Sequence, residues 1–125
     1  MTGKLSKRPI SPHLQVYKPQ LTSVMSILHR ITGMANVVGL LLFSWWLISA
    51  ASGVEAYSHF VEFITSGFGK FLLFGWTVAV MYHLFNGIRH LVWDTGRCLK
   101  IEQAYRAGYL VLAATFLATL LIWLS

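Results

Sequence analysis

Charged residues are scarce in this chain of 125 residues: Asp, Glu, Lys and Arg make up 11% of it, whereas 56% of the residues are hydrophobic. So little charge excludes an ordinary soluble fold and predicts a single domain in a membrane. Cysteine is almost absent as well. The lone Cys98 excludes an internal disulfide, and the absence of a Cys-x-x-Cys-His motif excludes the usual covalent attachment of haem.

Motifs of soluble enzymes are also missing. The chain has no Ser, His and Asp in the order of a hydrolase triad, no glycine-rich phosphate loop and no cysteine cluster for a metal. Its net charge of +6 comes from Lys and Arg residues that flank apolar segments, and no separate basic domain is present. A nucleic-acid partner is therefore not expected. Function has to be sought in the apolar segments themselves.

Three apolar segments predict membrane-spanning helices, at about residues 25–51, 68–93 and 104–124. Thr22 or Ser23 is suited to cap the first helix, and Gly96 is suited to end the second. The more polar stretch between the first two spans predicts a loop with a short interfacial helix. The fold class is therefore an all-α membrane protein, with residues 23–125 forming a three-span membrane anchor.

Residues 1–22 predict an extended arm at the membrane surface, because three prolines and four basic residues disfavour a helix. The arm has no apolar core, so neither a signal peptide nor a clear presequence is expected. Basic residues are numerous before and at the start of span one, where they are Lys4, Lys7, Arg8, Lys18 and Arg30. They are also numerous around the second loop, where they are Arg89, Arg97, Lys100 and Arg106. The first loop has Lys70 alone. This asymmetry predicts an N-terminus on the cytoplasmic or matrix side.

The end of the second predicted span carries polar residues that are costly in a membrane. His83, Asn86, Gly87 and His90 stand at i, i+3, i+4 and i+7, so they share one helical face. A neutral imidazole at His83 has two uses there: a hydrogen bond to a neighbouring helix, or an axial bond to a haem iron. His83 and His90 leave the same side of one helix about 10 Å apart, which fits poorly with two ligands of one haem. A second ligand would come from another helix or chain.

A second polar face lies at the start of the first span, where Ser26, His29, Arg30 and Gly33 have the same spacing. We expect the hydroxyl, the imidazole and the guanidinium to converge. Such a group can hydrogen-bond a carbonyl oxygen and stabilise negative charge on it during reduction, or can bind haem propionates in a bidentate manner. The alternative for Arg30 is an anchor at the end of the span, whose side chain reaches the interface.

We expect structural roles for the remaining ionisable residues. Arg89 is expected to be an interfacial anchor. Asp94 is expected to form an ion pair with Arg97 or Arg89, or else to pass protons. His13 and His59 lie in predicted loops and are interpreted as solvated. From Leu110 to Leu124 the third span has only the hydroxyl residues Thr115 and Thr119 as polar interior residues, so it is expected to serve in packing.

Three motifs together give a specific resemblance: residues 8–14 (RPISPHL), 26–33 (SILHRITG) and 83–94 (HLFNGIRHLVWD). They closely resemble the cytochrome b membrane-anchor subunit of succinate dehydrogenase, respiratory complex II, in the same order and with the same three spans. The resemblance implies that His83 is an axial ligand of the iron of haem b, with the other ligand supplied by a second anchor subunit. It also implies that Ser26 and Arg30 bind ubiquinone in a pocket lined by Ile27, and that His29 and Arg30 lie near the haem propionates.

The resemblance also implies partners. The chain would pack with the second membrane-anchor subunit into a helical bundle in the phospholipid membrane, and its arm would contact the iron–sulfur subunit, which carries electrons from the flavoprotein subunit. It would then be a subunit of an enzyme without being catalytic alone. The absence of a recognisable presequence favours a bacterial inner membrane over a mitochondrial one.

Three alternatives to this function remain. The first is an anchor of the fumarate reductase type, because the direction of electron flow depends on the quinone and on the partner subunits. The second is a small proton channel or transporter that uses His83, Asn86 and Asp94. The third is an anchor with a purely structural role.

Overall fold

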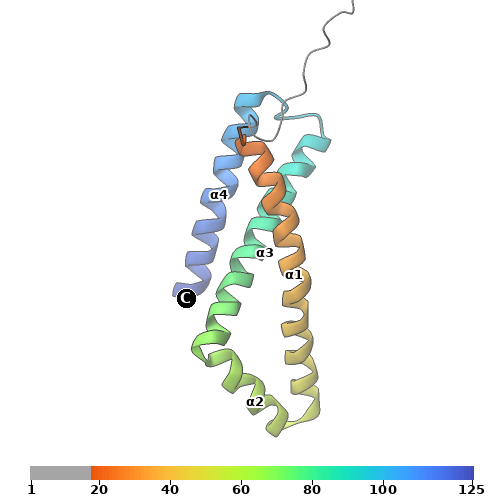
Figure 1. Cartoon of the computed structure of the whole chain (residues 1–125), viewed down its shortest axis with the longest axis vertical. Coiled ribbons are helices and arrows are strands. Elements are labelled where there is room, and N and C mark those ends of the chain that lie inside the picture. Colours follow the sequence, from red (N-terminus) through yellow and green to blue (C-terminus); the bar gives the residue numbers. More distant parts are fainter. Residues whose placement is uncertain (1–17) are drawn as a thin grey trace, which may run out of the picture.

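The computed structural model describes residues 18–125, which form four helices and no strands (Figure 1). In chain order the helices are α1 (Leu21–Ser52), α2 (Val54–Thr65), α3 (Gly67–Asp94) and α4 (Ile101–Leu124). The predicted all-α class is confirmed. The proposed arm falls almost entirely within residues 1–17, so the arm and His13 lie outside the described residues and stay predictions.

Three of these helices, α1, α3 and α4, are long and apolar enough to cross a membrane. At 1.5 Å per residue they measure about 48, 42 and 36 Å, against a bilayer core of about 30 Å. The three predicted spans are confirmed. Each helix extends beyond its predicted span by one to four residues, at one end or at both. The short helix predicted between the first two spans is also present as α2, which is 12 residues long.

The predicted cap of the first helix was wrong. The helix begins at Leu21, and Gln20, with an extended backbone (φ −89°, ψ 151°), occupies the N-cap position without a side-chain hydrogen bond to the helix. Thr22 already lies inside the first turn. A side-chain cap is present at α3, where the Ser66 hydroxyl accepts a hydrogen bond from the backbone N–H of Gly69 at 3.1 Å.

Two residues with positive φ set the ends of helices. Gly53, at φ 110°, separates α1 from α2, and this is a conformation that only glycine adopts without strain. Gly96, at φ 74°, follows the last turn of α3, as the sequence predicts. Cys98 also has a positive φ, of 58°, although it carries a side chain. The indole Nε1 of Trp93 donates to the Cys98 carbonyl at 3.1 Å and so holds this turn against α3.

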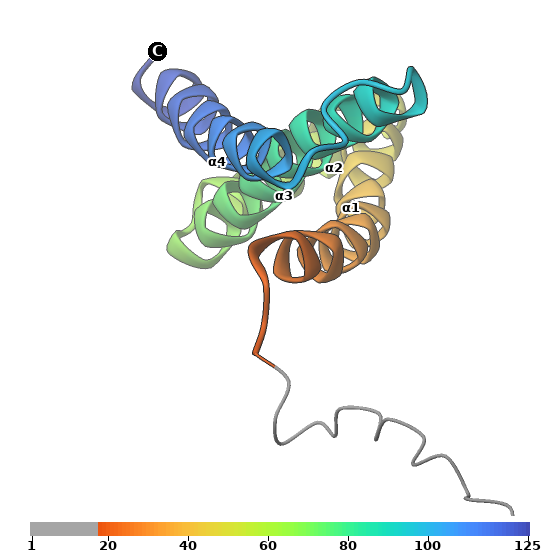
Figure 2. The ribbon, with the colours of Figure 1, turned by 90° about the horizontal axis from the view of Figure 1, so that it is seen from above.

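The helices pack around α3, which is in contact with each of the other three (Figure 2). The buried core at one end consists of Met25, Tyr82 and Val111, one from each long helix, with Leu21 and Phe85 packed against them. The Tyr82 hydroxyl donates to the Met25 carbonyl at 2.8 Å. The buried residues of α4 are small or medium in size, which supports the packing role predicted for the third span: Ala104, Gly108, Val111, Thr115 and Thr119.

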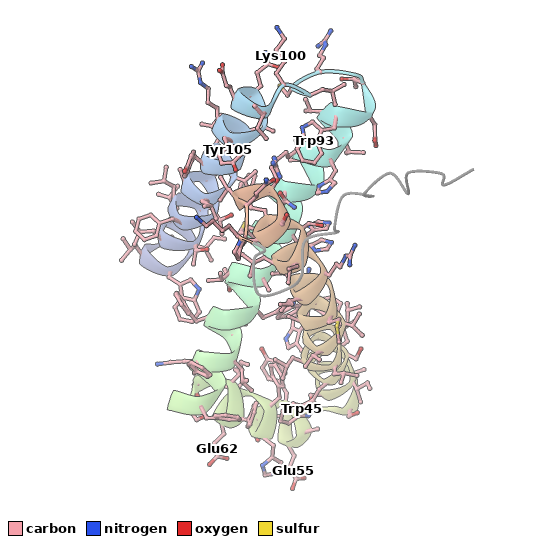
Figure 3. All side chains as sticks on the ribbon, turned by 45° about the horizontal axis from the view of Figure 1, so that its top comes forward. Trp45, Glu55, Glu62, Trp93, Lys100 and Tyr105 are labelled. Carbon is pink, nitrogen blue, oxygen red and sulfur yellow. The ribbon has the colours of Figure 1, made fainter. Side chains whose placement is uncertain are left out.

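The two ends of the bundle differ in content. Trp93 and Lys100 lie at one end, which we call the Trp93 end, together with the start of α1 (Figure 3). Trp45, Glu55 and Glu62 lie at the opposite end, with α2 (Figure 3). At the Trp93 end α1 crosses close to both α3 and α4, so residues from α1 and α3 come together there.

Candidate functional site

Three histidine rings form a stack between α1 and α3. His29, on α1, lies between the two histidines of α3: its ring centroid is 3.9 Å from that of His83, with the planes 8° apart, and 5.0 Å from that of His90, with the planes 24° apart. The shared face predicted for His83 and His90 is therefore confirmed. The structure adds His29, which fills the space between them.

The imidazole of His83 is held by α1. Its Nδ1 lies 3.1 Å from the His29 carbonyl oxygen and 3.2 Å from the Thr32 hydroxyl. A carbonyl oxygen can only accept, so Nδ1 carries the proton and Nε2 keeps its lone pair. Gly33 allows this approach, because a Cβ atom at Gly33 would lie 3.2 Å from Cε1 of the ring. The arrangement is the one that a metal-binding imidazole needs: one nitrogen fixed by a carbonyl and the other available.

The other two histidines differ in their partners. His90 donates from Nδ1 to the Asn86 carbonyl at 2.7 Å, and its ring makes an edge contact with Trp93, with centroids 5.1 Å apart. Nδ1 of His29 is buried and has no hydrogen-bond partner among residues 18–125. Because the rings are stacked face to face, their nitrogens do not converge on one point. In the described part of the chain, no group of three or more His, Cys, Asp or Glu residues is placed to hold a metal ion.

A partly open pocket of about 410 Å³ lies next to the histidine stack at the Trp93 end. It is formed by the first turns of α1 and the last turns of α3, and its lining is Thr22, Ser23, Ser26, Ile27, Arg30, Arg89, His90 and Trp93. Ser26, Ile27 and Arg30, the residues assigned to the quinone from the resemblance, therefore lie in one pocket. An aromatic wall, two guanidinium groups and hydroxyls surround the same space.

His29 does not line this pocket, so the prediction that it converges with Ser26 and Arg30 was wrong. Successive residues on a helix point about 100° apart, and His29 consequently faces α3 while Arg30 faces the pocket. Ser26 and Arg30 therefore belong to the pocket, and His29 belongs with His83.

Arg89 was also predicted wrongly. The sequence predicts an anchor that reaches the interface, but the side chain is only 5% exposed. Its Nη2 donates to the Ala104 carbonyl of α4 at 3.0 Å, its Nη1 donates to Oδ1 of Asn86 at 3.3 Å, and its guanidinium lies 4.1 Å from the centre of a Trp93 ring. Arg89 thereby joins α3 to the start of α4 and forms part of the pocket wall.

Two of the remaining predictions concern exposed side chains. Asp94 is exposed, and the structure records no ion pair for it with any residue from 18 to 125, so the expected pairing with Arg97 or Arg89 is absent there. His59 is exposed, in agreement with its interpretation as a surface residue, but it lies on α2 and not in a loop as predicted. The sequence reasoning missed Arg89 and Trp93 as pocket residues, although their i, i+4 spacing places them on one face.

The chain matches the family model of the succinate dehydrogenase/fumarate reductase transmembrane subunit over residues 4–122. It is 40% identical over 114 residues to the succinate dehydrogenase cytochrome b556 subunit of Paracoccus denitrificans, covering 91% of this chain and 88% of the relative. It is 43% identical over 129 residues to the cytochrome b560 subunit of Reclinomonas americana (94% and 85%). It is 40% identical over 120 residues to the human mitochondrial cytochrome b560 subunit (92% and 69%).

Proposed function

Because this chain belongs to the family of succinate dehydrogenase/fumarate reductase transmembrane subunits, we propose that it is the cytochrome b anchor of a succinate:quinone oxidoreductase and forms part of both its quinone site and its haem site. The observation that supports this proposal best is the position of the pocket. Ser26, Ile27 and Arg30 surround one space, which His90 of the histidine stack also lines, and the imidazole of His83 belongs to the same stack.

In this proposal the pocket binds ubiquinone, the substrate. The Ser26 hydroxyl and the Arg30 guanidinium donate hydrogen bonds to a carbonyl oxygen of the quinone ring, and Ile27 and Trp93 form apolar walls. Hydrogen-bond donors that already lie at the oxygen on which negative charge develops favour reduction of the quinone, because they need little reorganisation when the electron arrives. Arg30 is exposed in this chain, so its guanidinium is available to a ligand.

The residues around His83 fit haem b. Nε2 of His83 would be the axial ligand, since Nδ1 is committed to the His29 carbonyl. The buried, unpartnered Nδ1 of His29 and the exposed guanidinium of Arg30 are available as donors to propionates. Bound there, the haem supplies a centre that takes up and releases one electron at a time. The second axial ligand would come from the second anchor subunit.

The partners and the orientation belong to the same proposal. The iron–sulfur subunit, which receives electrons from the flavoprotein subunit, would dock at the Trp93 end and meet residues 1–22. This end would face the cytoplasm of a bacterium, with the chain in the inner membrane. An anchor of the fumarate reductase type is the alternative, because the family that matches includes transmembrane subunits of both enzymes.

The quinone role is tested by Ser26→Ala and Arg30→Ala in the purified complex. We expect each variant to lower succinate-dependent ubiquinone reduction by roughly tenfold or more, since a donor to developing charge is lost. Succinate oxidation by an artificial acceptor should stay near the native rate. His59→Ala, at the opposite end, is the control and should change neither rate. Equal loss of both activities in the Ser26 and Arg30 variants would contradict the quinone role.

A further inference from the structure

Arg89 is a buried cation without a carboxylate partner. All four acidic side chains of the chain, Glu55, Glu62, Asp94 and Glu102, are exposed, whereas that of Arg89 is 5% exposed. Glu55 and Glu62 lie at the far end of the bundle from Trp93, the residue against which Arg89 stacks (Figure 3). The partners that Arg89 does have, the Ala104 carbonyl, the Asn86 amide and the Trp93 ring, are all neutral.

Hydrogen-bond donors are in excess around this cation. Nε of Arg89 and Nδ2 of Asn86 are both buried and lack an acceptor in the part of the chain that the structure describes. Asn86 is completely buried, with 0% exposure. A buried positive charge with unused donors is costly unless an anion or a further acceptor compensates it, above all within a membrane. This arrangement therefore calls for negative charge nearby.

The pocket is where such charge would sit. Arg89 and Arg30 both line it, from α3 and α1 respectively, and no carboxylate side chain is part of its lining. We propose that Arg89, together with Arg30, gives the pocket a preference for a quinone that carries negative charge on a ring oxygen. Nη2 and Nη1 of Arg89 already donate hydrogen bonds to Ala104 and Asn86. Arg89 is therefore a positioning residue, which acts on the quinone through its fixed positive charge and its contact with Trp93.

This inference rests on the proposed quinone site and adds its charge selectivity. A quinone that gains an electron before a proton is negatively charged on its oxygens, so a fixed cation would favour binding at that stage. The expected change in affinity follows from Coulomb's law. With an effective dielectric constant of about 20, a unit charge about 12 Å from a monovalent anion changes the affinity for that anion by roughly tenfold, and a closer charge changes it more.

Two probes of similar shape separate charge from packing. One is 2-hydroxy-1,4-naphthoquinone, which is an anion at neutral pH, and the other is 1,4-naphthoquinone, which is neutral. Their dissociation constants are measured by titration of the purified, detergent-solubilised complex. In Arg89→Gln we expect the anionic probe to bind roughly tenfold more weakly and the neutral probe to bind within about twofold of the native value.

The decisive variant is Asn86→Asp, which leaves Arg89 and its contacts in place. It puts a carboxylate at the position of the Oδ1 atom that lies 3.3 Å from Nη1, so it neutralises the cation without removing it. We expect the same selective loss for the anionic probe as in Arg89→Gln. Arg97→Gln removes one positive charge from an exposed position and is the control, for which both constants should stay within about twofold of the native values.

The outcomes distinguish this inference from the proposed function. If Asn86→Asp leaves the ratio of the two constants unchanged, or if Arg89→Gln weakens both probes equally, Arg89 has a packing role and the inference is overturned. A changed haem spectrum in Arg89→Gln without a change in that ratio would assign the charge to the haem and would overturn it as well. If Arg30→Ala affects neither probe, the pocket is not the quinone site and the proposed function itself fails.

Discussion

The imidazole of His83 on α3 donates from Nδ1 to the backbone carbonyl of His29 on α1, over 3.1 Å. This bond joins two helices at the level of the histidine stack and selects the tautomer of His83. It also uses a carbonyl that already accepts from the Thr32 hydroxyl at 3.0 Å, one turn along α1. The position of a potential iron ligand is therefore set by the backbone of the neighbouring helix.

Gly33 leaves room for this approach of the two helices. A Cβ at Gly33 would stand 3.2 Å from Cε1 of His83, whereas a Cβ at Gly75 would meet nothing within 4 Å among residues 18–125. We expect Gly33→Ala to displace the imidazole and to lower the haem content of the purified complex by several-fold. Gly75→Ala, the matched control within a span, should leave the haem content unchanged. The measurement is haem per complex by absorption, and equal haem contents in the two variants would contradict this account.

Tyr82 stabilises the pairing of α1 with α3. Its hydroxyl is buried and donates to the Met25 carbonyl at 2.8 Å. We expect Tyr82→Phe to destabilise the complex by about 0.6 to 1 kcal/mol, because one interhelical hydrogen bond is lost while the ring stays in the core. Tyr109→Phe, at a side chain that is 61% exposed, is the control and should have no measurable effect. The comparison is made by chemical denaturation in detergent, and a loss of the same size in both variants would argue against the role of the bond.

Cys98 is a site where stability can be gained. Its φ of 58° is a left-handed conformation that costs a residue with a side chain about 1 kcal/mol. We expect Cys98→Gly to relieve this strain and to raise the midpoint of thermal unfolding slightly, and Cys98→Val to lower it. The bond from Trp93 to the carbonyl at this position involves only backbone there, so it should persist in both. A lower midpoint for the glycine variant than for the native protein would show that the conformation is not strained.

Much of the fold follows from local pattern. The apolar segments predict three spans, Gly96 predicts the end of α3, and helical spacing places His83 and His90 on one face, because these features depend on residues near one another in sequence. The N-terminal cap is different. Thr22 and Ser23 are good capping residues, yet the helix starts at Leu21, two residues after Pro19, with Gln20 as the cap, so capping preference alone did not determine where the helix begins.

The site was predicted less completely than the fold, and Arg89 shows why. Its burial depends on α4 folding back so that the Ala104 carbonyl meets the guanidinium, a contact between residues 15 positions apart that no helical period reveals. The stack of His29 between two histidines of α3 likewise depends on how α1 crosses α3. By contrast, the grouping of Ser26, Ile27 and Arg30 came from the resemblance of their motif to that of a known family.

The central claim is that His83 is a haem ligand beside a quinone pocket, and reduced-minus-oxidised optical spectra of the purified complex test it most directly. The native complex and His83→Ala are compared, with His59→Ala as the control at the other end of the bundle. The account predicts a b-type signal in the native complex and in the control, and a signal that is lost or shifted in His83→Ala. A native complex without a b-type signal, or an unchanged spectrum in His83→Ala, would contradict it.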